Sequence, residues 1–118
     1  MREPSSQFIS GQKFGSLDIL ERDLQRVIQL DPGNADALNA LGYTLADQTD
    51  RHEEAYSLIA RALIIKPEEA AFLDSMGWVL YRLDRLSEAI DYLQRAYQLF
   101  PNDEVAAHLG EVLWKDGQ

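Results

Sequence analysis

ALNALGYTLAD, residues 37–47, spaces three leucines around Gly42 in the order Leu38, Leu41 and Leu45. FLDSMGWVLYR repeats this spacing around a glycine 35 residues later, and VAAHLGEVLW repeats part of it around another glycine after 33 more. Apolar residues three or four positions apart share one face of an α-helix. The stretch therefore predicts an amphipathic helix that occurs three times, with a period of about 34 residues.

A second pattern follows each of the first two copies and ends in a proline, Pro67 or Pro101. Its apolar residues are Ala55, Ile59 and Ala62 in the first copy and Ala89, Leu93 and Ala96 in the second. Each full repeat thus predicts two helices, and short connections make neighbouring helices antiparallel. No segment has a convincing strand pattern. The expected fold is an all-α row of helical hairpins.

Residues that favour helix ends divide the chain further. Ser16 and Asn34 are suitable N-caps, and Asp50 with Glu53 resembles a capping box. A tight turn is expected at Asp84–Arg85. The predicted helices cover residues 17–30, 35–47, 51–65, 67–83, 86–99 and 103–115.

Length, composition and charge exclude several functional classes. The chain has 118 residues, of which 46% are hydrophobic, so it is expected to form about one folded domain. No uncharged apolar run approaches the ~18 residues of a membrane span, so direct membrane insertion is not expected. The eleven basic residues are scattered among twenty acidic ones, for a net charge of −9, which argues against nucleic acid as a partner. Without cysteine, disulfides and thiol chemistry are impossible.

Candidate catalytic groups have simpler structural interpretations. The acidic pairs Glu53–Glu54, Glu68–Glu69 and Asp103–Glu104 each fall in the first turn of a predicted helix, where the helix dipole favours negative charge. His52 and His108 are far apart in sequence and are expected to be isolated surface histidines. No nucleophile frame, phosphate loop or metal-binding motif is present. We expect no enzymatic activity, no cofactor and no metal.

These repeats resemble the tetratricopeptide repeat (TPR), whose pattern is W-x2-L-G-x2-Y, then A-x3-F, then P. Leucine replaces both the usual Trp and the usual Tyr in the two full repeats. The sequence of these repeats is also similar to that of the C-terminal repeats of Gram-negative bacterial TPR proteins, some of them envelope lipoproteins. The resemblance implies an α-α superhelix, divided as follows: a flexible N-terminal lead (1–16), the second helix of a degenerate repeat (17–34), two TPRs (35–69 and 70–102), and the first helix of an incomplete repeat or a cap (103–118).

The resemblance also implies where a partner binds. In TPR arrays the first helix of each repeat lines a concave groove. The matching positions here are Asn39, Tyr43, Asp47, Asp74, Trp78, Tyr81, Arg82, Glu111, Trp114 and Lys115. Tyr43 and Trp78 occupy one repeat position and Tyr81 and Trp114 another, so an aromatic ladder is expected along the groove. In this family the repeat glycine lets the paired helix approach closely, at Ala55 or Ala89 in this chain.

Two functions follow from this mapping. The first is a non-catalytic scaffold or adaptor that binds a protein or peptide in the aromatic groove. The alternative is self-association, or docking within a longer solenoid, through Leu109, Leu113 and Trp114 of an uncapped last helix. The basic residues with which some TPR modules grip the carboxylate of chaperone tails are absent from the matching positions. Partner identity and compartment stay open, with the cytoplasm and, for a longer parent, the bacterial envelope as alternatives.

Overall fold

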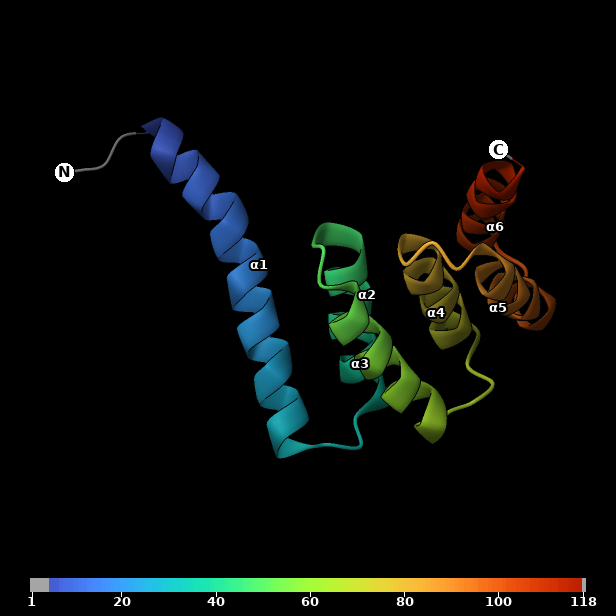
Figure 1. Cartoon of the computed structure of the whole chain (residues 1–118). Helices are drawn as coiled ribbons and strands as arrows, with labels where there is room; N and C mark the ends of the chain where they lie inside the picture. The colour runs from blue at the N-terminus through green and yellow to red at the C-terminus, as the bar shows by residue number, and fades with distance from the viewer. Residues whose placement is uncertain (1–4, 118) are drawn as a thin grey trace.

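The computed structural model describes residues 5–117, with side chains from residue 15 onward. Every regular element in this range is a helix (Figure 1). The helices are α1 (Ser5–Leu30), α2 (Ala35–Gln48), α3 (His52–Ile65), α4 (Ala70–Arg82), α5 (Leu86–Leu99) and α6 (Asp103–Asp116). The prediction of an all-α fold is therefore confirmed.

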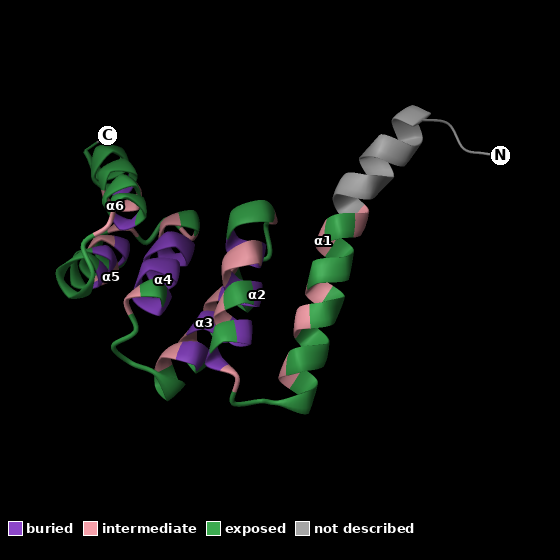
Figure 2. Cartoon of the chain, turned by 180° about the vertical axis from the view of Figure 1, so that it is seen from behind, coloured by how far each residue is buried: buried purple, intermediate pink, exposed green. Residues whose placement is uncertain are grey.

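Consecutive helices form hairpins, and α4 lies at the centre of the row. α2 packs on α3 and α4 packs on α5, while α4 also contacts α2, α3 and α6. Every residue from Phe72 to Leu80 in α4 is buried, whereas α6 buries only Val105 and Val112 (Figure 2). The core thus runs through the two hairpins and thins toward the last helix.

The first helix is longer than the sequence indicated. α1 begins at Ser5, so Ser16 lies inside a helix and is not an N-cap. Residues 1–4 of the predicted flexible lead lie outside the described residues, and residues 5–16 belong to α1. Between residues 15 and 30, α1 buries no side chain fully and packs on α2 through half-buried Leu24 and Ile28. Arg51 adds a second attachment, since its guanidinium binds the Glu21 carboxylate at 2.6 and 2.9 Å.

The structure confirms one predicted helix start in full and corrects two others. Asn34 caps α2 by accepting the Ala37 N–H, as expected. The capping box at Asp50 is wrong because Arg51 is the N-cap residue of α3 and no side chain caps that helix. Glu68 and Glu69 precede α4 instead of opening it, since the chain turns there and the helix begins at Ala70. The other two acidic pairs do lie in the first turns of α3 and α6.

The first two repeat glycines hold their hairpins together closely. A Cβ on Gly42 would lie 2.6 Å from Cγ1 of Ile59, and one on Gly77 would lie 2.5 Å from Cγ of Leu93. The carbonyl oxygens of Ala55 and Ala89 are 3.1 and 3.2 Å from the same two points. Gly110 has nothing within 4 Å, because no helix described in the chain packs on that side of α6. The two helices of a hairpin therefore approach each other closely at Gly42 and Gly77 but not at Gly110.

Candidate functional site

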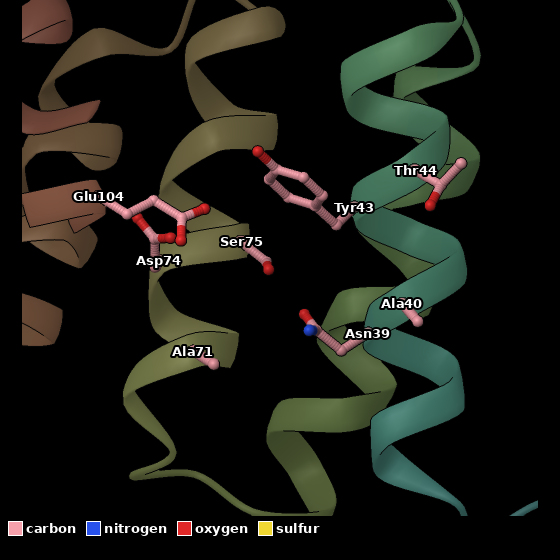
Figure 3. Close-up of a pocket in the computed structure, with 8 residues that line it drawn as sticks. All are labelled: Asn39, Ala40, Tyr43, Thr44, Ala71, Asp74, Ser75 and Glu104. Carbon is pink, nitrogen blue, oxygen red and sulfur yellow. The ribbon is translucent and has the colours of Figure 1, made fainter. Parts of the chain in front are cut away.

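The helices that begin each repeat, α2, α4 and α6, line two neighbouring pockets. The first, which we call the α2–α4 pocket, has a volume of about 330 Å³. Asn39 and Tyr43 extend into it from α2, and the carboxylates of Asp74 and Glu104 gather on its opposite side (Figure 3). The full lining is Asn39, Ala40, Tyr43, Thr44, Ala71, Asp74, Ser75 and Glu104.

The second pocket lies further along α4 and reaches α6. This α4–α6 pocket has a volume of about 290 Å³ and is lined by Trp78, Tyr81, Arg82, Asp84, Glu111 and Lys115. Its two basic and two acidic residues balance in charge. Asp74, Trp78 and Tyr81 lie at helical spacing on one face of α4, so the two pockets adjoin. We call the surface that they form together the α2–α4–α6 groove.

The imidazole of His108 contacts one residue from each of the two pockets, Asp74 and Trp78. Nδ1 of His108 lies 2.9 Å from Oδ1 of Asp74, and both side chains are nearly buried, with 13% and 10% exposed. The His108 ring stacks on Trp78 with ring centres 4.4 Å apart and an interplanar angle of 27°. Tyr43 lies 6.4 Å from the same ring. The prediction of an isolated surface histidine at this position is wrong.

Electrostatics of the pocket follow from this cluster. Burial disfavours the charged imidazolium of His108, but the hydrogen bond to Asp74 and the negative charges of Asp74, Glu104 and Glu111 outweigh it, so the pKa of His108 is raised. Burial, and then the charges of Asp47, Glu104 and Asp74, raise the pKa of the Tyr43 phenol to about 12. Both shifts have the sign expected in a region of negative potential.

The predicted groove residues fall into three environments. Asn39, Tyr43 and Asp74 line the α2–α4 pocket, while Tyr81, Arg82 and Lys115 line the α4–α6 pocket. Trp78 borders the second pocket but is only 8% exposed, and its Nε1 donates a hydrogen bond to Oδ1 of Asp47 at 3.3 Å. Trp114 is 69% exposed and lines neither pocket.

The expected aromatic ladder takes a different form among the described residues. Tyr43 and Trp78 both neighbour the His108 imidazole. Tyr81 packs on Trp78 with ring centres 5.0 Å apart, and its hydroxyl donates to Glu111 at 2.7 Å. That hydrogen bond and the Glu111 charge raise the pKa of the Tyr81 phenol. The ring cluster is thus formed by Tyr43, His108, Trp78 and Tyr81, without Trp114.

The spacing of the repeats could have predicted the contact between His108 and Asp74. Asp74 is three residues before Gly77, and His108 is two residues before Gly110. The first helices of successive repeats lie side by side, so residues at neighbouring repeat positions come into contact. A carboxylate and an imidazole 34 residues apart are therefore expected to meet. The donor atoms of Asp74, Glu104 and His108 all lie within 4.8 Å of one another, a spacing that a cation can also bridge.

A row of helical hairpins whose first helices share one groove is an α-helical repeat protein. Two tetratricopeptide repeat models match the sequence, one over residues 21–71 and the other over residues 70–103. The chain belongs to the TPR family. None of the helices in residues 5–117 has the length and apolar character that a membrane crossing needs.

Similar proteins agree with this assignment. A TPR repeat-containing protein of Pseudomonas aeruginosa is 53% identical over 100 residues, which are 85% of this chain and 17% of that protein. The structure of a Thermobaculum terrenum O-GlcNAc transferase mutant has 28% identity and a TM-score of 0.79, over 88% of this chain and 20% of that one. The first TPR of Spaghetti (RPAP3), bound to an HSP90 peptide, has a TM-score of 0.78 at 18% identity, over 96% of this chain and 90% of that one. The TPR solenoid and the resemblance to bacterial repeat proteins are confirmed.

Proposed function

We propose that this chain is a non-catalytic protein-interaction module that binds a peptide, or an exposed segment of a protein, along the α2–α4–α6 groove. The observation that carries the proposal is the adjacency of two open pockets on the same face of α4. Together they offer aromatic surface for anchoring and polar groups for orientation. The proposed contacts are Asn39, Tyr43, Asp74, Trp78, Tyr81, Arg82 and Lys115, with Trp114 at the edge.

A similar structure supports a peptide as the ligand, whereas the residues of this chain argue against one kind of peptide. The Spaghetti structure contains an HSP90 peptide, so a TPR array of this shape can hold a peptide. The resemblance to the TPR family implies that modules which grip chaperone tails use basic side chains to bind the carboxylates. The matching positions here hold Asn39, Tyr43, Asp74 and Ser75, and all four line the α2–α4 pocket together with the carboxylate of Glu104. A partner of different chemistry is therefore proposed.

The experiment that tests the proposal blocks the groove without disturbing the core. Ala40 is an exposed residue of α2 that lines the α2–α4 pocket, and Ala106 is an exposed residue of α6 that lines neither pocket. Both Ala40→Arg and Ala106→Arg are expected to fold, because surface helix positions tolerate arginine. Affinity capture with the intact chain should lose its specific partner with Ala40→Arg and retain it with Ala106→Arg. Equal capture by both variants would place the binding surface elsewhere.

A second candidate is self-association, or docking on further repeats, through α6. Leu113 and Trp114 are 47% and 69% exposed, and Phe100 in the preceding turn is 62% exposed. Exposed apolar residues at the end of a repeat array commonly contact a neighbouring repeat or subunit. Sedimentation of the wild type and of Trp114→Ala across a concentration series tests this candidate. A wild-type chain that stays monomeric at high concentration would rule out a homodimer.

A further inference from the structure

The α2–α4 pocket is the more negative half of the groove. Its charged lining residues, Asp74 and Glu104, are both acidic, and no basic residue lines it. Asp74 is hydrogen-bonded to His108, whereas Glu104 makes no ion pair with any residue in the described part of the chain. The α4–α6 pocket, in contrast, contains Arg82 and Lys115 beside its two acids. The two halves of the groove therefore differ in charge.

Hydrogen-bond acceptors in the same pocket are incompletely used. Oδ1 of Asn39 is buried and has no hydrogen-bond partner within the described structure. An unpaired buried acceptor is costly, so a ligand donor that reaches it when the Asn39 amide turns toward the pocket is favoured. Glu104 provides carboxylate oxygens on the opposite side (Figure 3). The pocket thus presents acceptors from α2 and from α6, on either side of α4.

Aromatic surface completes the environment. The Tyr43 ring extends from α2 into the pocket, with its hydroxyl end toward the carboxylates (Figure 3). The electron-rich face of a tyrosine ring attracts ammonium and guanidinium groups. The pocket volume of about 330 Å³ accommodates a long side chain.

We propose that the α2–α4 pocket binds the cationic side chain, arginine or lysine, of a partner peptide, with Glu104 as the residue that supplies the attraction. The inference rests on the proposed function and specifies the chemistry of the partner. A guanidinium or ammonium group donates hydrogen bonds to several acceptors at once, as the opposed Asn39 and Glu104 require. An acidic side chain would meet two carboxylates in the same space. The preference is thus opposite to that of a module that grips acidic tails.

A divalent metal ion is the competing occupant of this carboxylate cluster. Asp74, Glu104 and His108 have donor atoms close enough to bind one. Coordination by His108 needs its neutral imidazole, and coordination through Nδ1 would replace the contact that this nitrogen makes with Asp74. A peptide cation leaves that contact in place, which is why we favour it.

Fluorescence anisotropy with short labelled peptide mixtures tests the inference. The mixtures are randomised over uncharged residues except at one central position, which holds Arg, Lys, Glu or Leu. In about 0.15 M salt, which screens distant charges beyond ~8 Å, we expect the Arg and Lys mixtures to bind about tenfold tighter than the Glu mixture. Equal binding of the Arg and Glu mixtures would overturn the inference and leave the groove function standing. Absence of binding by every mixture would contradict both.

Matched variants separate the pocket from the overall charge of the protein. Glu104→Gln and Glu53→Gln each remove one carboxylate from the first turn of a helix, and only Glu104 lines the pocket. We expect Glu104→Gln to reduce the preference for Arg over Leu about fivefold and Glu53→Gln to leave it unchanged. An equal reduction in both variants would assign the preference to general electrostatics. Micromolar ZnCl₂ binding that depends on Glu104, together with no preference for Arg, would assign the pocket to a metal ion instead.

Discussion

The imidazole of His108 lies 2.9 Å from the carboxylate of Asp74, one repeat earlier in the chain. This contact joins the middle of α4 to a last helix that buries only Val105 and Val112. The same imidazole stacks on Trp78, which lines the α4–α6 pocket. This polar pair, together with the hydrogen bond from Tyr81 to Glu111, therefore links α6 to α4 along the groove.

This pair predicts a pH dependence of stability. The pKa of His108 is raised in the folded state above its unfolded value of about 6.5. Protonated His108 therefore stabilises the fold in full below that unfolded value, and the contribution disappears as the pH rises through the raised folded pKa. We expect the difference in unfolding free energy between the wild type and His108→Gln to shrink from about pH 6 upward. Urea titrations across this range measure it.

The other histidine provides the control for this measurement. His52→Gln leaves the contact between His108 and Asp74 intact, so its difference from the wild type should not follow the same pH profile. A difference for His108→Gln that stays constant or grows with rising pH would mean that the pair contributes no charge-dependent stability.

The repeat glycines predict opposite effects of one substitution. Gly77→Ala places a methyl group 2.5 Å from Leu93 Cγ and is expected to destabilise the protein by about 1–3 kcal/mol through overpacking. Gly110→Ala meets open space and is expected to stabilise α6 by up to ~1 kcal/mol, since alanine favours the helix. Thermal unfolding of the two variants distinguishes these outcomes. The packing account fails if both substitutions change stability in the same direction.

The turn between α4 and α5 predicts a stabilising substitution. Asp84 has a φ of 63°, in the left-handed region, and the Arg85 N–H bonds back to the Leu80 carbonyl at 2.9 Å. Glycine adopts this conformation without the steric penalty of about 1–2 kcal/mol that a side chain incurs. Asp84→Gly should therefore raise the melting temperature. Asp91→Gly, at an exposed position inside α5, serves as the control and should lower it slightly.

The two tryptophans should respond very differently to truncation. Trp78 is 8% exposed and Trp114 is 69% exposed. Trp78→Ala is expected to destabilise the fold by about 3–5 kcal/mol through loss of core contacts, and Trp114→Ala by about 0.5 kcal/mol or less. Denaturant unfolding measures both. Similar losses would show that α6 is buried against something in solution, as self-association through Trp114 requires.

The repeat pattern was sufficient to predict the helices, because it depends on apolar spacing that any helical hairpin must bury. Helix starts were harder to predict. The capping box at Asp50 fails because the helix begins one residue later than that pattern needs, with Arg51 as the N-cap residue bound to Glu21 and Glu54. Such a choice depends on partners in another helix, and local sequence does not contain them.

Prediction of the candidate site was partial for a similar reason. The repeat pattern predicts that Asn39, Tyr43 and Asp74 share one surface, and in the structure they line one pocket. The repeat pattern could not show that Trp78 is mostly buried, because the burial of this side chain depends on how closely α6 approaches α4. No local motif marks His108 as part of a site, although alignment of successive repeats places it beside Asp74.

Site-specific photo-crosslinking tests the groove most directly. A benzophenone amino acid replaces Ala71, an exposed residue that lines the α2–α4 pocket, or Ala106, an exposed residue that lines neither pocket. With the captured partner present, irradiation should give a crosslinked product from position 71 and little from position 106. Equal yields, or a product from position 106 alone, would contradict the proposal that the α2–α4–α6 groove is the binding surface.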